Sequence, residues 1–269
     1  MSWYTPFFME HLHIELAENQ KIYFASDFHL GAPTRSLSDK REREIVDWLE
    51  SIRQDAAAIF LVGDIFDFWF EYRHVIPRGF IRFQSKLLSL RDQGIPVHFF
   101  HGNHDMWMFD YFPTEFGIPV YKDNILLTTG QHKLLIGHGD GLGPGDRFYK
   151  VLKKVFRSKI GQWGFEWLHP NIGIGVANYW SSSSRISSDK RDDGFSGEKE
   201  WLYQYCKEVE SESHHDYYVF GHRHLPLEMK LNPDSTYFNL GEWVKAKTYG
   251  EYSRKGGFRL IGYGPENQV

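Results

Sequence analysis

Short hydrophobic runs alternate with amphipathic segments along most of the chain. Residues 21–26, 58–63 and 97–102 are continuous apolar runs of strand length, and each predicts a buried strand. Between them, the pattern predicts one helix that begins with Ser38 as its N-cap and another over residues 78–91. This alternation indicates an α/β fold.

The pattern continues in the second half of the chain. Residues 124–129 and 133–139 predict a hairpin that turns at Gly130 and Gln131, and a helix is expected from about residue 195 to 209. Further strands are expected over residues 217–222, 227–231, 236–241 and 257–263. A single α/β domain accounts for all of these elements.

Residues 141–192 interrupt this rhythm. They lack strand patterns and read as short helices rich in Trp, Phe and basic residues, so we expect a helical cap inserted between residues 1–140 and 193–269 of the α/β domain. The cap segment has nine basic and four acidic residues, a net charge of +5. Because the whole chain carries −4, the remainder carries −9.

The composition restricts the chemistry that the chain can support. Of its 269 residues 41% are hydrophobic and 25% charged, which is typical of a folded globular protein. Fourteen His accompany a single Cys, which excludes an internal disulfide, thiolate zinc clusters and iron–sulfur sites. A bound metal would therefore have imidazole and oxygen ligands.

Neither a targeting segment nor a membrane span is evident. The first sixteen residues lack the basic and apolar regions of a signal peptide. The longest apolar run, residues 56–62, is far shorter than the roughly 20 residues that a membrane helix needs. We therefore expect a cytoplasmic protein, with peripheral membrane contact still open.

Polar residues that can bind metal follow five of the predicted strands. They are Asp27 and His29; Asp64 and Asp67; Asn103, His104 and Asp105; His138 and Asp140; and His222 and His224. In open α/β sheets, sites form at the carboxyl ends of the strands. Each motif alone also fits a turn or a buried histidine, but the ordered set indicates a metal site.

The motif order D-x-H, GD-x-x-D, GNHD, HGD and GHRH, from Asp27 to His224, resembles that of the calcineurin-like metallophosphoesterases. The resemblance implies an α/β fold of two sheets in a sandwich, flanked by helices, with two divalent metal ions at the strand ends. It places one metal on Asp27, His29, Asp64 and His224, and the other on Asp64, Asn103, His138 and His222, with Asp64 bridging. It also places His104 above the metals, oriented by Asp105, so that Asp64, His104 and Asp105 are the expected catalytic residues.

The mixed nitrogen and oxygen ligands restrict the metal. Such a set suits Mn²⁺, Fe²⁺, Zn²⁺ or Co²⁺ better than Ca²⁺ or Mg²⁺ alone, and we favour Mn²⁺. Two such ions roughly 3.5–4 Å apart can bind both the attacking and the leaving oxygen of a displacement at phosphorus. The sequence therefore predicts a binuclear hydrolase of phosphoester bonds.

Two longer segments narrow the resemblance. GDIFDFWF around Asp64 and HGDGLGPGDRFYKVLKK after His138 look like segments of the UDP-2,3-diacylglucosamine hydrolases of the lipid A pathway, which carry a helical cap at this point. The resemblance implies cleavage at the α-phosphate to UMP and 2,3-diacylglucosamine 1-phosphate (lipid X). It implies substrate contacts by Asp146, Tyr149, Arg185 and Lys190. The better-known hydrolases have Arg in place of His104 and Glu in place of Asp67.

The cap allows two interpretations. Its aromatic residues, including Trp163, Phe165, Trp167 and Trp180, fit an acyl-chain tunnel or a bilayer contact, but equally the core of a small helical unit. Its basic residues Lys150, Lys153, Lys154, Arg157 and Lys159 fit lipid headgroups or a solvated face. For a lipid substrate, we expect both features to meet the cytoplasmic face of the inner membrane.

Other functions of the same motifs stay open. The first alternative is a metal-dependent phosphodiesterase or phosphomonoesterase that acts on a nucleotide or another small substrate. The second is a non-catalytic binding scaffold, which the complete set of metal-binding residues disfavours. The expected partner is a UDP-linked diacyl sugar lipid; we expect no nucleic acid and no obligate protein partner.

Overall fold

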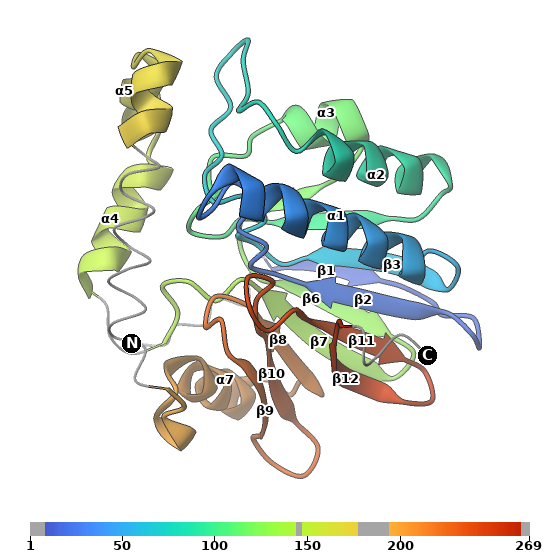
Figure 1. The fold of residues 1–269 in the computed structure, drawn as a ribbon. Helices are drawn as coiled ribbons and strands as arrows, with labels where there is room; N and C mark the ends of the chain where they lie inside the picture. Colours follow the sequence, from blue (N-terminus) through green and yellow to red (C-terminus); the bar gives the residue numbers. More distant parts are fainter. Residues whose placement is uncertain (1–8, 144–146, 177–193, 265–269) are drawn as a thin grey trace.

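The computed structural model describes residues 9–143, 147–176 and 194–264, and two six-stranded sheets form its centre (Figure 1). The first sheet has the order β12 (Gly257–Gly262), β11 (Thr248–Ser253), β2 (Lys21–Ala25), β3 (Ala56–Leu61), β4 (Val97–Phe100) and β5 (Val120–Tyr121). The second has the order β1 (Glu10–His13), β6 (Ile125–Thr129), β7 (His132–Gly137), β8 (Tyr217–Phe220), β10 (Thr236–Leu240) and β9 (Pro226–Lys230).

The strands that precede the predicted metal-binding residues run parallel within each sheet. In the first sheet β2, β3 and β4 are parallel neighbours, and in the second β7 and β8 are parallel neighbours. Their carboxyl ends therefore meet at one edge of each sheet. The two-sheet sandwich expected from the sequence is confirmed.

Apolar side chains fill the space between the sheets and the space under the helices. Phe24 and Phe60 of the first sheet pack with Leu134 and Val219 of the second. Each such side chain contributes about 1.5–3 kcal/mol when fully buried. The outer face of the first sheet packs against α1 (Arg35–Ile52), α2 (Ile81–Asp92) and α3 (Tyr111–Phe116).

The other outer face is covered by the C-terminal part of the chain. A turn of 3₁₀ helix (Gly197–Lys199) leads into α7 (Trp201–Glu212), whose Leu202, Cys206 and Val209 pack against the second sheet. Cys206 is fully buried there. The sandwich is thus arranged as helix, sheet, sheet and helix layers, as Figure 1 shows.

Three predicted helix starts were wrong. The helix expected from about residue 195 begins at Trp201, after the 3₁₀ turn. Thr34, not Ser38, is the N-cap of α1, because the Ser38 hydroxyl instead accepts a hydrogen bond from the Gly31 amide at 2.7 Å. The second helix begins at Ile81 rather than residue 78, because Gly79 and Phe80 have φ angles of 122° and 57°. Backbone in the left-handed region cannot continue into a right-handed helix.

The cap segment forms helices that lie along one side of the sandwich in Figure 1. They are α4 (Arg147–Arg157), α5 (Lys159–Glu166) and a helical stretch at residues 170–176. Phe165 lies with its ring centroid 4.8 Å from that of Trp107, whose indole N–H donates to the Phe156 carbonyl at 2.9 Å. An aromatic contact therefore fastens the cap helices to the body.

The cap boundaries at residues 141 and 192 stay a prediction, and the second lies outside the described residues. Among the described helices, none combines the length and the apolar character needed to cross a bilayer.

Candidate metal centre

The residues after the strands adopt an unusual backbone conformation. Asp27, His29, Asp64, His222 and His224 all have φ angles between 44° and 68°. Residues other than glycine seldom adopt this left-handed conformation, and it concentrates at functional sites. This conformation turns the chain sharply where these strands end. Five of the seven predicted ligands therefore share the same local backbone conformation.

The first group of predicted ligands lies close together. Asp27, His29, Asp64 and His224 have ligand atoms within 4.8 Å of one another. Nε2 of His224 is 3.1 Å from Oδ1 of Asp27 and 3.1 Å from Nε2 of His29. The structure thus brings all four residues expected at the first metal to one place.

The second group shares Asp64. Asp64, His138 and His222 also have ligand atoms within 4.8 Å of one another. Nε2 of His138 is 3.4 Å from Oδ2 of Asp64 and 3.2 Å from the side-chain oxygen of Asn103. Asp64 lies between the two groups, where a bridging ligand belongs.

Several observations test whether these residues fit divalent ions. Ligand atoms about 2.1 Å from one ion lie roughly 3.0–3.5 Å apart in octahedral or tetrahedral geometry, as most of these pairs do. Oδ1 of Asp27 and Oδ2 of Asp64 are buried and make no hydrogen bond within the described part of the chain. Nδ1 of His138 is 2.9 Å from the Val62 carbonyl, to which it donates, and this leaves Nε2 to bind a metal. The donor set fits two such ions.

The electrostatics of the site also favour positive charge. Burial alone would raise the pKa of Asp64, but His138 and His104 outweigh it and hold that pKa well below its usual range. Burial lowers the pKa of His138, yet Asp64 and Asp27 raise it to about 10. The carboxylates therefore stay ionised at neutral pH, as metal ligands must.

Two glycines allow the loops to approach one another. A Cβ on Gly102 would lie 2.1 Å from Oδ1 of Asp64, and one on Gly221 would lie 2.7 Å from Oδ2 of Asp27. Both distances are far below van der Waals contact. Glycine at these two strand ends is therefore a requirement of the site.

His104 lies beside the first group, with its ring centroid 4.9 Å from that of His29. Its Nδ1 donates to the Asp67 carbonyl at 3.0 Å. Burial lowers the pKa of His104 to about 4, although Asp64 opposes the shift. At neutral pH the ring is therefore neutral, and its proton is directed at Asp67.

Asp105 takes a different position from the one expected. It was expected to orient His104, but its carboxylate accepts from the backbone N–H groups of Asp64, Gly102, Ile65 and Phe66 at 2.7–3.3 Å. Burial and then the nearby Asp64 charge raise the pKa of Asp105 to about 7. Asp105 holds the Asp64 loop, whereas the Asp67 carbonyl holds the His104 ring.

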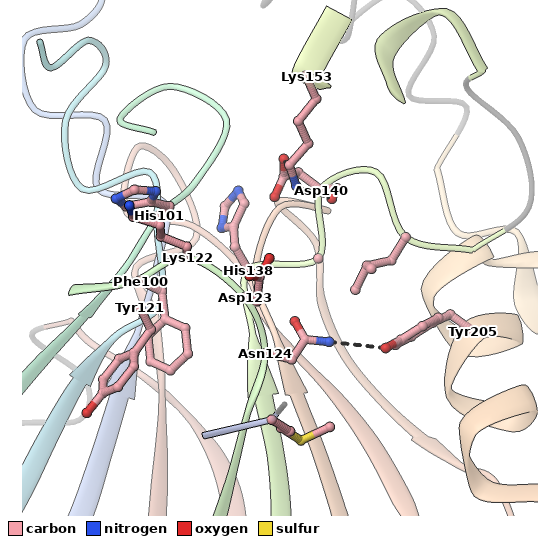
Figure 2. Close-up of a pocket in the computed structure, with 13 residues that line it drawn as sticks. Phe100, His101, Tyr121, Lys122, Asp123, Asn124, His138, Asp140, Lys153 and Tyr205 are labelled. Atoms are coloured by element: carbon pink, nitrogen blue, oxygen red, sulfur yellow. Dashed lines mark hydrogen bonds and ion pairs between the residues drawn. The ribbon is translucent and has the colours of Figure 1, made fainter. Parts of the chain in front are cut away.

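Two further contacts at the site were missed in the sequence. The buried Arg41 of α1 donates to the carbonyls of Phe28, His29 and Ala32 at 2.6–2.7 Å. Lys153 of α4 reaches Asp140, with Nζ 2.6 Å from Oδ2 (Figure 2). The partners are 9 to 13 residues apart and lie on a helix and on the loop before it, so their contacts depend on how each helix docks and no periodic signal revealed them.

Figure 2 shows Lys153 and Asp140 at a cavity of about 270 Å³ beside His138. Asn124, which donates to the Tyr205 hydroxyl at 3.1 Å, lines the same cavity. Phe100 and Tyr121 of the first sheet, Lys153 of α4 and Tyr205 of α7 also line this cavity, so the cap helix α4 lies beside the His138 side of the metal centre.

The predicted substrate-binding residues are not placed at the site. Asp146, Arg185 and Lys190 lie outside the described residues. Tyr149 belongs to α4, but its side chain is likewise outside the description. Their contacts with a substrate stay predictions.

The profile of the calcineurin-like phosphoesterases matches residues 20–226, a span that contains all the predicted ligands. The chain belongs to this family. Family membership makes it a phosphoester hydrolase and implies divalent metal ions at the centre described above.

Relatives of this phosphoesterase carry a more specific name. A Porphyromonas gingivalis protein named UDP-2,3-diacylglucosamine hydrolase is 38% identical over 85% of this chain and 92% of its own. Proteins with the same name from Actinobacillus succinogenes and Vibrio cholerae are 25% and 27% identical, over 83% and 88% of this chain and 92% and 95% of theirs. The sequence-based identification of the family is confirmed.

Proposed function

We propose that this phosphoesterase hydrolyses UDP-2,3-diacylglucosamine at the α-phosphate, giving UMP and 2,3-diacylglucosamine 1-phosphate. The observation that carries the proposal is the 38% identity to the Porphyromonas gingivalis protein of that name, over most of both chains. The cap helices beside the metal centre support it, because a diacyl substrate needs an apolar surface that a small nucleotide does not.

Two divalent ions complete the site in this proposal, and Mn²⁺ is favoured. Asp27, His29, Asp64 and His224 would hold one ion, and Asp64, Asn103, His138 and His222 the other. Such ions would lower the pKa of a bound water and offset negative charge on the phosphate. Because the predicted ligands include no thiolate, they suit Mn²⁺ or Fe²⁺ better than metals that prefer sulfur ligands.

The side chains around the ions position the reactants. His104, held by the Asp67 carbonyl, would face the substrate, and Asp105 fixes the loop that carries Asp64. Asp146, Tyr149, Arg185 and Lys190 are proposed to contact the glucosamine phosphate. Phosphate oxygens suit the two cationic side chains of this set.

The cap is proposed to meet the membrane. Trp163 and Trp167 of the cap are 61% and 75% exposed, with ring centroids 6.1 Å apart. Lys159 of α5 lines the same groove as Trp163, and Lys154 is exposed on α4. Exposed indoles next to lysines fit the interface of an anionic bilayer, in agreement with a peripheral enzyme on the cytoplasmic side of the inner membrane.

The test compares two substrates on the metal-loaded enzyme. Turnover of UDP-2,3-diacylglucosamine is measured beside that of a soluble p-nitrophenyl phosphodiester, each with and without added Mn²⁺. We expect a strong preference for the lipid and a loss of both activities after chelation. Equal turnover of the two substrates would overturn the lipid assignment, and Trp163→Ser should reduce only the lipid activity.

A further inference from the structure

A loop of the catalytic body carries exposed arginines beside the cap. Residues 73–82, here called the arginine loop, lie between β3 and α2 and end in the first turn of α2. They contain Arg73, Arg78 and Arg82 and no acidic residue. All three arginines are exposed.

None of the three guanidinium groups has a hydrogen bond or an ion pair to another residue that the structure describes. The basic residues of α4 differ in this respect. Lys150 donates to the Gly143 carbonyl, Lys153 binds Asp140 and Arg157 binds Asp123. Much of the positive charge of α4 is thus used within the protein, whereas that of the arginine loop faces solvent.

Large apolar side chains lie among these arginines. Ile81 is 76% exposed and Val75 is 48% exposed. Aliphatic side chains that alternate with arginines on an exposed segment are typical of contacts with an anionic bilayer, where the aliphatic groups enter the interface and the guanidinium groups meet phosphates. A nucleic acid would not need the exposed isoleucine.

The arginine loop and the cap are neighbours. In Figure 1 the loop rises between α5 and α2, at the same end of the molecule as α5. A groove of about 510 Å³ has Arg73 on one side and Lys159 and Trp163 of α5 on the other. The rings of Tyr72 and Phe165 lie 6.5 Å apart at the base of this contact.

The acidic residues in this groove do not cancel the charge of the loop. Glu71 is buried, and its carboxylate accepts from the Trp69 indole and from the backbone amides of residues 109–111. Asp110 and Glu166 are exposed at the groove, which Arg73 and Lys159 also line. Arg78 and Arg82 do not line the groove, so these acidic residues of the groove leave their positive charge available to bind a partner.

The arginine loop also borders the metal centre. The segment that leads into it contains Asp67, whose carbonyl binds His104. Near its end, the Phe80 ring lies 3.5 Å from the position of a Cβ on Gly31, two residues after His29. A surface that holds this loop therefore lies near the place where a lipid substrate would have to enter.

We propose that the arginine loop is a second contact with an anionic lipid bilayer, made by the catalytic body independently of the cap. Arg78 and Arg82 bind lipid phosphates, and Ile81 and Val75 enter the interface. The inference rests on the proposed lipid substrate for its purpose. Together with the cap, the loop would form one membrane-binding surface beside the metal centre.

The test is flotation of the metal-loaded protein with vesicles of phosphatidylcholine and phosphatidylglycerol in equal parts, and with vesicles of phosphatidylcholine alone. We expect binding to the anionic vesicles only, weakened by salt. Arg78→Gln with Arg82→Gln should weaken it about 25-fold, since each arginine near an anionic surface contributes about fivefold. Ile81→Ser should weaken it about tenfold.

The matched control is Arg254→Gln with Lys230→Gln, which removes two exposed cations, without an ion pair among the described residues, from the β11–β12 turn and from β9 on another part of the molecule. This pair should bind vesicles as the unmodified protein does. Hydrolysis of the soluble phosphodiester should be unchanged in all the variants, which verifies their fold. If the double variant Arg78→Gln with Arg82→Gln bound vesicles as strongly as the unmodified protein, the proposal would be overturned. A protein partner would then be the remaining explanation for the exposed loop.

Flotation needs no turnover, so its outcome is separate from that of the proposed function. Binding as expected without hydrolysis of UDP-2,3-diacylglucosamine would reject the substrate but keep the surface. Conversely, the protein could hydrolyse the lipid while its arginine loop contributes nothing to vesicle binding. That result would reject the proposed surface but keep the substrate.

Discussion

The Lys153 ammonium of α4 lies 2.6 Å from the Asp140 carboxylate, two residues beyond His138. Lys153 also donates to the Asp140 carbonyl at 2.9 Å. Burial would raise the pKa of Asp140, but Lys153 and then His138 outweigh it and keep that pKa far below its usual range. The cap helix is thereby tied to the loop that carries a predicted metal ligand.

Lys153→Met should loosen this tie. Removal of one partner leaves a buried carboxylate uncompensated, and we expect the KM for the lipid substrate to rise at least about tenfold. The value of kcat should change much less, because no predicted ligand is altered. Steady-state kinetics measure both constants. Lys230→Met, at an exposed lysine of β9 away from the cap, is the control; an equal effect of the two changes would contradict the role of the ion pair.

Asp64→Asn should remove the residue shared by the two ligand groups. We expect turnover to fall by at least about a hundredfold, as for the loss of one preorganised charge-stabilising group. Bound metal, measured by elemental analysis, should fall as well, while circular dichroism shows a folded protein. Asp92→Asn, an exposed change on α2, should alter neither quantity. Retention of full metal content by Asp64→Asn would refute the shared-ligand assignment.

Arg41 is a positioning residue, because it touches the backbone on both sides of His29 rather than a ligand atom. Arg41→Met leaves three carbonyls without their donor, and metal affinity should fall about 10–100-fold, as for other groups that support ligands. The Arg41→Lys variant should have a metal affinity between those of the unmodified protein and Arg41→Met. Metal titration followed by calorimetry measures the affinity; a lower melting temperature with unchanged affinity would show a purely structural role.

Glu210 supplies a pH-dependent part of the stability away from the metal centre. Burial would raise its pKa, but hydrogen bonds from His214 and Tyr218 outweigh this and lower it to about 2. The pKa of His214 is raised by the same hydrogen bond. A lowered acid pKa stabilises above its ordinary value of 4.5, and a raised histidine pKa stabilises below its ordinary value of 6.5.

Glu210→Gln should therefore cost most stability between these two pH values. Loss of about 1 kcal/mol of hydrogen bonding corresponds to a fall in Tm of about 2–4 °C in a domain of this size. The difference should shrink as the pH falls toward 2 and as it rises through the raised histidine pKa. Calorimetry across this range gives the profile, with Glu208→Gln on the same helix as the control. A difference independent of pH would contradict the ionic contribution.

Local sequence signals were sufficient for most of the strands and for the residues at their ends. The runs before Asp27, Asp64 and Asn103 are mostly apolar because those strands are buried on both faces of the sheet. The short strands β1 and β5 and the helix α3 were missed, since four, two and six residues carry little periodicity. The strand β11 was also missed, because Gly250 and Glu251 interrupt its apolar pattern.

Tertiary contacts account for the remaining errors. The Ser38 hydroxyl could cap a helix, but the Gly31 amide competes for it, and only the folded loop shows that competition. Asp105 was expected at His104, yet four backbone amides from two loops surround it. Arg41 and Lys153 looked like ordinary charges of amphipathic helices, and their partners depend on how the helices dock.

The predicted ligands come from both sheets and from both ends of the chain. Asp27, Asp64 and Asn103 follow strands of the first sheet, whereas His138, His222 and His224 follow strands of the second. During synthesis, a nascent chain released as far as residue 140 exposes only part of each ligand group. Both groups are complete only after residue 224 has left the ribosome, so the full set of ligands for the two metals forms only in the last part of synthesis.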